Sequence, residues 1–392
     1  MKKKFFWMFM VAAAAMTSCS SFDEPAVMDG EGEPLSRAGA RISYVTSEEQ
    51  LRNALDFGVS EIEITTDIAV SDTLVIDSDV TLTATQGKKL TFAGKATFYC
   101  NANTYFKGIT IDATNDLGTG AITLGTENIE VILDNVNLTQ NAVGTEDARS
   151  KAGIAIKYEA YDNSLIIKNN TVITLPSNKY VRGIDLLPSE TKSVKAIKIS
   201  DSRISIGTNP DFPSTYSRGI SFSNVECDSL VINKSTLEGA YYIINVNGTS
   251  KVNANVLNES TLSGRCGFNI WSNDFTALVE NSTIVGKNNW SGSTETFANV
   301  VINTTAQNSN MIFRNMTFKM DVNNEYQSNR QYAIQYRASN QTLLVEGNIT
   351  VIDTPKNDVN AYVVANYGVT DINASVNDFT FINTDANCKN FF

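Results

Sequence analysis

The sequence predicts an all-β fold, a right-handed parallel β-helix with one helix capping its N-terminal end. A pattern of short apolar strands recurs nine times, and the copies end 22 to 34 residues apart, an interval typical of stacked coils. Helical periodicity is convincing in only one segment, near the start. The last apolar positions of the nine copies are 111, 138, 172, 204, 237, 262, 284, 318 and 349.

The first residues of the chain resemble a bacterial export signal. Residues 2–4 are lysines, and residues 5–15 form an apolar run that is too short to span a bilayer. A small residue precedes Cys19, and this resembles a lipobox, in which cleavage leaves a lipidated thiol at Cys19. Acidic residues at 23–24 resemble the surface-export signal of Bacteroidota lipoproteins. The alternative is a plain secretory signal with an unrelated Cys.

We therefore expect a signal peptide at residues 1–18, a lipidated flexible tether at 19–41 and one β-helix domain at 42–392. The tether is rich in Gly, Pro, Ser and acidic residues and poor in apolar ones. Each buried methylene of the lipid would contribute roughly 0.8 kcal/mol to anchoring. We expect a monomeric outer-membrane lipoprotein, exposed at the cell surface, that contacts the membrane only through this anchor.

The composition excludes several classes of function. The net charge of −11 becomes −14 without residues 1–18, since 28 basic side chains then face 42 acidic ones. Such an acidic chain is unsuited to binding nucleic acid. The chain contains no His, which excludes His-based catalytic triads and His-ligated zinc. We expect no metal and no cofactor.

Four cysteines remain beyond the lipobox: Cys100, Cys227, Cys266 and Cys388. None of them has the CxxC spacing of a metal or redox site. They lie in or beside strand patterns, where Cys usually acts as a small buried apolar residue. A disulfide between neighbouring coils is the alternative in an oxidising exterior.

The predicted helix lies near residues 47–57. Thr46-Ser47-Glu48-Glu49 predicts a capping box, with Thr46 as the cap and Glu49 reaching back to it. The apolar side chains on one face of the helix are Leu51, Ala54 and Leu55. The helix would cover the open apolar end and the unpaired strand edge of a β-helix. Candidates for the plug at the other end are Phe379, Phe381 and residues 391–392.

Each later coil contains two recurring strands. The first opens with Gly in most coils, as in Gly183-Ile184 and Gly219-Ile220, and the second ends in Asn/Ser-x-Thr and an apolar residue, as in 311–318. With two or three short strands per coil, each strand would pair with its equivalent about 4.8 Å away, and apolar side chains would fill the interior. The Asn or Ser is expected to bond backbone groups at a turn and to stack on its counterpart in the next coil.

Residues 46–392 resemble the pectin-lyase-like β-helix superfamily, as found on Bacteroidota surface lipoproteins. The resemblance rests on the Thr-Ser-x-x-x-Leu-x-x-Ala-Leu opening and on the Gly-Ile and Asn-x-Thr strands of the coils. It implies the fold but no particular activity, because this fold hosts lyases, hydrolases, adhesins and inert spikes.

Most of the long loops follow the Asn-x-Thr strand and precede the Gly-Ile strand. Equivalent positions stack in a β-helix, so these loops are expected to form one wall along one edge. The loops are Thr139–Lys151, Leu175–Val181, Gly207–Ser217, Val285–Phe297 and Lys319–Gln331. Their aromatic residues, Tyr180, Phe212, Tyr216, Trp290, Phe297 and Tyr326, are candidates for stacking on sugar rings. The alternative is that each ring folds back over its own loop.

Two arginines stand at equivalent places in the repeat. Arg182 and Arg218 each precede the Gly of a Gly-Ile strand, so they are expected on adjacent coils, one strand spacing apart. Guanidinium groups so close repel each other unless an anion or a carboxylate lies between them. The sequence therefore predicts either an acidic ligand or a neighbouring carboxylate such as Asp185 or Glu190.

The expected function is non-catalytic binding of a glycan or another cell-surface polymer, as in an adhesin. The candidate binding residues are Tyr180, Arg182, Asp185, Phe212, Tyr216, Arg218, Trp290 and Tyr326. The alternative is a polysaccharide lyase acting on a uronic-acid polymer. The resemblance implies that such a lyase would use a Lys, Arg or Tyr base, for which the candidates are Lys179, Tyr180, Arg182 and Arg218, and only this alternative involves calcium. A glycosidase of the polygalacturonase kind is disfavoured because Asp185 stands alone in its strand.

Overall fold

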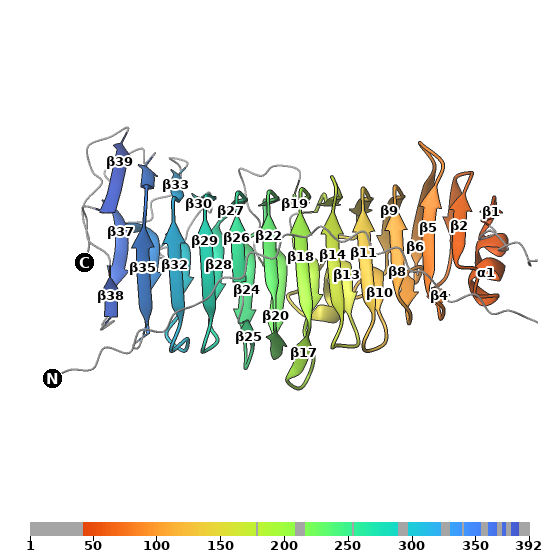
Figure 1. Cartoon of the computed structure of the whole chain (residues 1–392), viewed down its shortest axis with the longest axis horizontal. Coiled ribbons are helices and arrows are strands. Elements are labelled where there is room, and N and C mark those ends of the chain that lie inside the picture. The colour runs from red at the N-terminus through yellow and green to blue at the C-terminus, as the bar shows by residue number, and fades with distance from the viewer. Residues whose placement is uncertain are drawn as a thin grey trace, which may run out of the picture. The chain divides into compact units, whose positions relative to one another are not determined.

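The computed structural model describes residues 42–177, 179–207, 216–252, 255–288, 297–322, 330–338, 341–353, 360–366, 371–373 and 378–383. These residues form a parallel β-helix with one α-helix, as the repeat predicts (Figure 1). The expectations for the signal peptide, Cys19, Phe212, Trp290, Tyr326, Cys388 and residues 391–392 lie outside the described residues. Within the described ranges, no helix is long and apolar enough to cross a membrane.

Three long sheets run along the β-helix, and each coil contributes a strand to most of them. Sheet A is formed, in spatial order, by β1 (Ser43–Val45), β2 (Glu61–Ile64), β5 (Val80–Ala84), β8 (Thr104–Lys107), β11 (Glu130–Asp134), β14 (Ser164–Lys168), β18 (Ala196–Ser200), β22 (Leu230–Asn233), β26 (Asn255–Asn258), β29 (Thr276–Glu280), β32 (Asn310–Arg314), β35 (Thr342–Glu346) and β38 (Asp371–Asn373).

Sheet B follows sheet A in each coil. It is formed by β3 (Ile68–Val70), β6 (Lys89–Gly94), β9 (Thr110–Asn115), β12 (Asn137–Gln140), β15 (Val172–Leu175), β19 (Arg203–Ile206), β23 (Thr236–Glu238), β27 (Thr261–Gly264), β30 (Thr283–Asn288), β33 (Thr317–Val322), β36 (Ile349–Asp353) and β39 (Phe379–Asn383).

Sheet C contains the Gly-Ile strands, and a small sheet D widens three coils between sheets C and A. Sheet C is formed by β4 (Leu74–Ile76), β7 (Phe98–Cys100), β10 (Gly120–Leu124), β13 (Gly153–Tyr158), β16 (Val181–Leu186), β20 (Arg218–Ser223), β24 (Tyr242–Asn247), β28 (Cys266–Ile270), β31 (Phe297–Ile302), β34 (Arg330–Tyr336) and β37 (Asn360–Asn366). Sheet D is formed by β17 (Lys192–Val194), β21 (Val225–Cys227) and β25 (Lys251–Val252).

The core is a set of apolar columns that follow the register of the sheets. In sheet C, Ile156, Ile184, Ile220 and Ile244 lie side by side on successive strands, and all four are buried. Burying each such side chain contributes about 1.5–3 kcal/mol relative to leaving it exposed. Because side chains alternate along a strand, the residue after each of these isoleucines points away from the core.

The predicted second strand of each coil is in fact two strands, one in sheet A and one in sheet B. A residue with positive φ separates them, for example Lys234 (φ 48) between β22 and β23 and Asn281 (φ 50) between β29 and β30. This left-handed conformation turns the chain sharply from one sheet into the next, which the strand pattern alone does not reveal.

Serine side chains at this corner join each coil to the one before it. The Ser235 hydroxyl accepts a hydrogen bond from the Ser202 amide (3.1 Å), and the Ser260 hydroxyl accepts one from the Ser235 amide (3.1 Å). Ser282 repeats the contact with the Ser260 amide (3.0 Å). This serine ladder confirms that the Ser of the repeat bonds backbone groups at a turn.

Asparagine side chains stack beside the serine ladder. The Asn258 amide donates to the side chain of Asn233 (3.0 Å), and the Asn281 amide donates to that of Asn258 (2.9 Å). Asn315 donates in turn to Asn281 (3.2 Å). Asn258 with Asn233 and Asn315 with Asn281 are counterparts in register, so the Asn of these coils stacks on its counterpart as predicted.

Helix α1 (Glu48–Asp56) begins one residue later than the capping box predicted. Ser47, rather than Thr46, is the N-cap, and its hydroxyl accepts a hydrogen bond from the Gln50 amide (3.2 Å). The Gln50 side chain, rather than Glu49, reaches back and accepts from the Thr46 amide (2.8 Å). The capping pair is thus Ser47 and Gln50, an equally good Ser-x-x-Gln match that overlaps the predicted one.

The helix covers the N-terminal end of the core. Leu51, Ala54 and Leu55 are buried, as predicted for one face. Arg52 pairs with Glu48 (2.6 Å) and also donates to the backbone carbonyl of Asp72 (2.8 Å). These contacts fix the helix to the first coil.

The described cysteines behave as buried apolar residues. Cys100, Cys227 and Cys266 are buried free thiols, so the disulfide alternative does not hold among these three.

Candidate functional site

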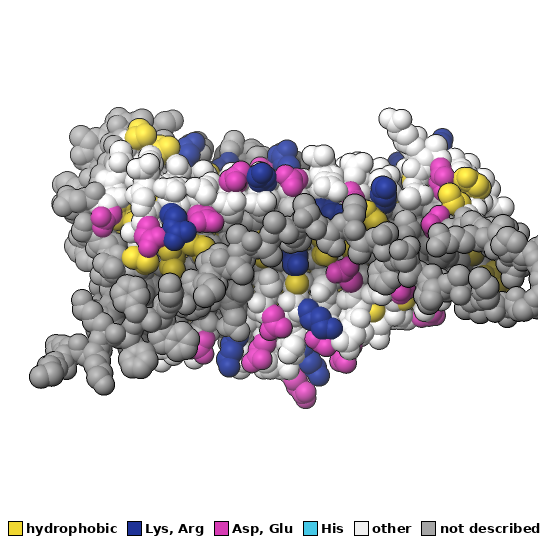
Figure 2. Space-filling view, in the orientation of Figure 1, with side chains coloured by type: hydrophobic (Ala, Val, Ile, Leu, Met, Phe, Trp, Pro, Cys, Tyr) yellow, Lys and Arg dark blue, Asp and Glu magenta, His cyan; other side chains and the backbone are white. Residues whose placement is uncertain are grey.

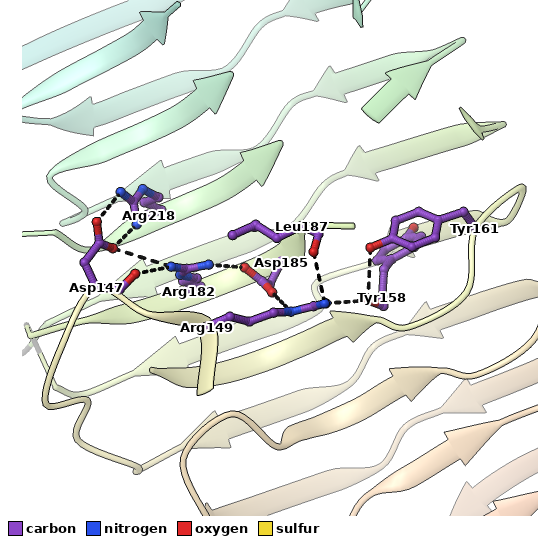
Figure 3. A network of polar contacts seen from close by, with 8 residues as sticks. All are labelled: Asp147, Arg149, Tyr158, Tyr161, Arg182, Asp185, Leu187 and Arg218. Carbon is purple, nitrogen blue, oxygen red and sulfur yellow. Dashed lines mark hydrogen bonds and ion pairs between the residues drawn. The ribbon is translucent and has the colours of Figure 1, made fainter. Parts of the chain in front are cut away.

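The loops that the structure describes lie where the repeat predicted, between sheet B and sheet C. The longest described one joins β12 to β13 and contains the short 3-10 helix η1 (Arg149–Lys151). This loop brings Asp147 and Arg149 against sheet C, next to the predicted pair Arg182 and Arg218 (Figure 3).

Arg182 and Arg218 lie in register on the adjacent strands β16 and β20, as their places in the repeat predicted. Both side chains are nearly buried, with 2% and 9% of their surface exposed. Asp147 lies between them. Both of its carboxylate oxygens accept hydrogen bonds from Arg218, and its backbone carbonyl accepts one from Arg182 (2.9 Å).

Asp185 forms the second bridge of the cluster. Its carboxylate is fully buried, and its two oxygens bond Arg182 (2.7 Å) and Arg149 (2.6 Å). Arg149 also donates to the backbone carbonyls of Tyr158 and Leu187. The arginine pair is therefore balanced by carboxylates of the protein, Asp185 as predicted and Asp147 instead of the suggested Glu190.

The repeat predicts the loop that contains Asp147 and Arg149 but does not single out either residue. A sequence feature that could have pointed to these two residues is the charged run Glu146-Asp147-Ala148-Arg149. It stands in a long loop that is otherwise largely uncharged. We name Asp147, Arg149, Arg182, Asp185 and Arg218 the arginine cluster. Its three arginines exceed its two aspartates by one positive charge, within a chain whose net charge is −11.

Two of the predicted aromatic residues lie together beside this cluster. The rings of Tyr180 and Tyr216 are parallel, with centroids 5.6 Å apart and an interplanar angle of 6°. Tyr241 extends the stack, 6.4 Å from Tyr216, and the guanidinium of Arg265 lies 4.4 Å from the centre of the Tyr241 ring. We call Tyr180, Tyr216 and Tyr241 the tyrosine stack.

The stack limits how a ligand can contact these rings. Tyr216 stacks with both Tyr180 and Tyr241, so neighbouring rings compete with a ligand for its faces. It is nevertheless 42% exposed. Both Tyr180 (φ 49) and Tyr216 (φ 61) adopt the left-handed backbone conformation, which is uncommon for bulky residues and is typically retained at functional sites.

A column of polar residues extends from the arginine cluster across the outer side of sheet C. Asp185, Ser221, Asn245 and Asn269 lie side by side on β16, β20, β24 and β28. Each directly follows an inward-pointing apolar residue, so alternation directs it outward. All four are buried. We call this set the polar column.

The charged side chains are not segregated by sign on the face shown in Figure 2, where basic and acidic groups lie interspersed. Among the residues that the structure describes, no group of three or more Cys, Asp and Glu side chains is arranged to hold a metal ion. Lys179 is exposed and directly precedes the half-buried Tyr180.

Comparisons with known proteins add no further assignment. No family model matches the chain, and no curated protein matches its sequence.

Proposed function

We propose that this protein is an exported lipoprotein of the pectin-lyase-like kind whose β-helix binds an extended glycan without cleaving it. The polymer would lie along the outer side of sheet C, next to the tyrosine stack. The observation that carries this proposal is the register, which places the half-buried Tyr180 next to the exposed Tyr216 beside sheet C. Partly exposed aromatic and hydroxyl groups on successive coils suit a repeating, hydroxyl-rich ligand.

The pairing of the arginines favours binding over lyase chemistry. A lyase would need guanidinium groups free to neutralise a uronate carboxylate. Here Arg218 binds both oxygens of Asp147, and Arg182 is shared between Asp147 and Asp185. The protein's own carboxylates thus occupy the positions that a uronate would take.

Native affinity electrophoresis tests the proposal. The chain from residue 20 onward is run in gels that contain single polysaccharides, neutral (xylan, β-glucan, mannan) or uronate-rich (polygalacturonate, alginate). We expect retarded migration in at least one gel. Tyr216→Ala should weaken that retardation roughly two- to tenfold, as expected for about 0.5–1.5 kcal/mol of aromatic contact. Tyr44→Ala, which removes an exposed ring at the capping end, is the control.

Two results would overturn the proposal. Unretarded migration in every gel would exclude glycan binding of useful affinity. Growth of the ultraviolet absorbance of an unsaturated product with polygalacturonate or alginate, lost in Arg218→Ala, would establish a lyase instead.

A further inference from the structure

The far end of the polar column is a chain of amides that all point the same way. Asn303 donates through Nδ2 to Oδ1 of Asn269 (2.9 Å), and Asn269 donates through Nδ2 to Oδ1 of Asn245 (2.8 Å). All three side chains are buried. Each amide in this chain therefore receives a hydrogen bond from one neighbour and passes one to the next.

Because the three amides point the same way, the last of them, Asn245, has a side-chain donor without a protein acceptor. Asn245 Nδ2 is buried, and no described residue accepts its hydrogen bond. Rotating the Asn245 amide does not help, because Nδ2 would then face Nδ2 of Asn269. An unpaired buried donor costs about 1–3 kcal/mol, so a missing acceptor is the simplest account of it.

An exposed tryptophan lies beside the same amides. Trp271 directly follows β28, two residues after Asn269, so strand alternation places both on the outer side of sheet C. The Trp271 amide donates to the carbonyl of Val246 (2.8 Å), and Thr305 donates to the Trp271 carbonyl (2.6 Å), which fixes the backbone. The side chain remains 40% exposed. Asn247, half-buried, ends the neighbouring strand β24.

The residues of this group favour an uncharged ligand. Asn245, Asn247, Asn269, Asn303 and Trp271 have no charge of their own, and the charged residue Arg337 follows one strand beyond Asn303 in the same row. The nearest carboxylate of the polar column is Asp185, two strands before Asn245, and both of its oxygens are bound by arginines. Neutral amides match hydroxyl groups, which both donate and accept, and an indole packs against the C–H face of a sugar ring.

We propose that Trp271, Asn247 and the amides of Asn245, Asn269 and Asn303 form a subsite for a neutral sugar residue. The indole contacts the face of the sugar ring, and a side-chain rearrangement that uncovers Asn245 Nδ2 lets it donate to one of the hydroxyl oxygens. This subsite rests on the proposed glycan-binding function and specifies which sugar class is bound and where. It lies three strand spacings from β16, roughly 14 Å, so one polymer chain can reach both it and the tyrosine stack.

The test uses the same gels, with tryptophan fluorescence as a second readout. Trp271→Ala should weaken binding to the neutral polysaccharide about tenfold or more, and Asn247→Ala several-fold, with thermal midpoints close to that of the parent chain. Asn245→Asp keeps the acceptor for Asn269 and removes the donor, so it should also lose binding. If the Asn245→Asp variant does not fold, the Trp271→Ala and Asn247→Ala variants still test the subsite. Tyr44→Ala should bind as the parent does.

The outcomes separate the two proposals. If the parent chain is retarded by a neutral gel and Trp271→Ala binds equally well, the subsite is wrong and glycan binding stands. If only the uronate gels retard the parent chain, the neutral subsite is likewise wrong. If no gel retards the parent chain, both proposals fall.

Discussion

Asp147 binds Arg218 through both carboxylate oxygens, and so a single loop residue ties two consecutive coils together. The same residue accepts a hydrogen bond from Arg182 through its backbone carbonyl. The contact closes the loop between β12 and β13 over the arginine pair. It makes the arginine cluster a structural element as well as part of the candidate binding surface.

Removing the buried carboxylate of this cluster should be strongly destabilising. Asp185→Ala leaves Arg149 and Arg182 without their shared partner in a buried setting, and we expect a loss of about 3–5 kcal/mol. Asp147→Ala should cost less, because the Asp147 side chain is 37% exposed and water can replace it. Urea unfolding followed by circular dichroism measures both.

The control for these variants is a surface ion pair in the same domain. Glu226 pairs with Lys251 at 3.7 Å, and both side chains are close to half exposed. Glu226→Ala should therefore change stability by less than about 1 kcal/mol. Equal losses for Asp185→Ala and Glu226→Ala would contradict a structural role for the cluster.

Breaking the serine ladder should cost more than one hydrogen bond, because the Ser260 hydroxyl also donates to the carbonyl of Asn258 (2.7 Å). Ser260→Ala removes the acceptor of the Ser235 amide, and an amide left unpaired costs about 1–3 kcal/mol. Ser223→Ala, at a half-buried position of β20, is the comparison. The shift of the urea midpoint measures the effect, and a midpoint for Ser260→Ala no lower than that for Ser223→Ala would argue against the ladder.

The capping helix should make stability depend on pH in the acid range. Burial alone raises the pKa of Glu48, but hydrogen bonds from Arg52 and Ser71 outweigh it and hold the pKa below 4.5. A carboxyl whose pKa is lower in the folded state contributes fully above the unfolded value, and that contribution disappears as the pH falls through the folded value. The stability difference between the parent chain and Glu48→Gln should therefore shrink below about pH 4.5.

Thermal midpoints between pH 3 and 6 test this dependence. Glu49→Gln, at the exposed neighbouring position, is the matched control. A difference between the parent and Glu48→Gln that stays constant across this range would contradict the expected role of Glu48.

The described thiols should be unreactive in the folded protein. Burial raises the pKa of Cys100, Cys227 and Cys266 to about 12, so thiolate is scarce at pH 8. With Cys388→Ser in the chain from residue 20 onward, we expect no labelling by an aromatic disulfide reagent until denaturant is added, and then three labelled thiols. Rapid labelling of the native chain would show that these strands open readily.

The period of the repeat was sufficient to predict the fold and the pairing of Arg182 with Arg218. Residues at equivalent positions of successive coils lie on neighbouring strands, so their spacing in the sequence predicts which residues are in contact. The same reasoning located the loops between sheets B and C and brought Tyr180 next to Tyr216.

The parts that escaped prediction are those that the repeat does not constrain. Asp147 and Arg149 lie in a loop with no counterpart of equal length in the next coil, so nothing in the period fixed where their side chains point. The positive φ of Lys234 is not a preference of lysine, and the corner it makes became visible only in three dimensions. The pattern of long loops does not indicate Trp271, because this residue directly follows strand β28 of sheet C.

The serine ladder also makes the molecule modular. Because each corner hydroxyl accepts from the equivalent amide of the coil before it, excision of residues 236–260 would join Ser235 to Thr261 and leave the Ser235 amide facing the hydroxyl of Ser282. The serine ladder itself would remain continuous after the deletion. Gain or loss of whole coils is thus a route by which descendants of this chain can lengthen or shorten the surface they offer to a polymer.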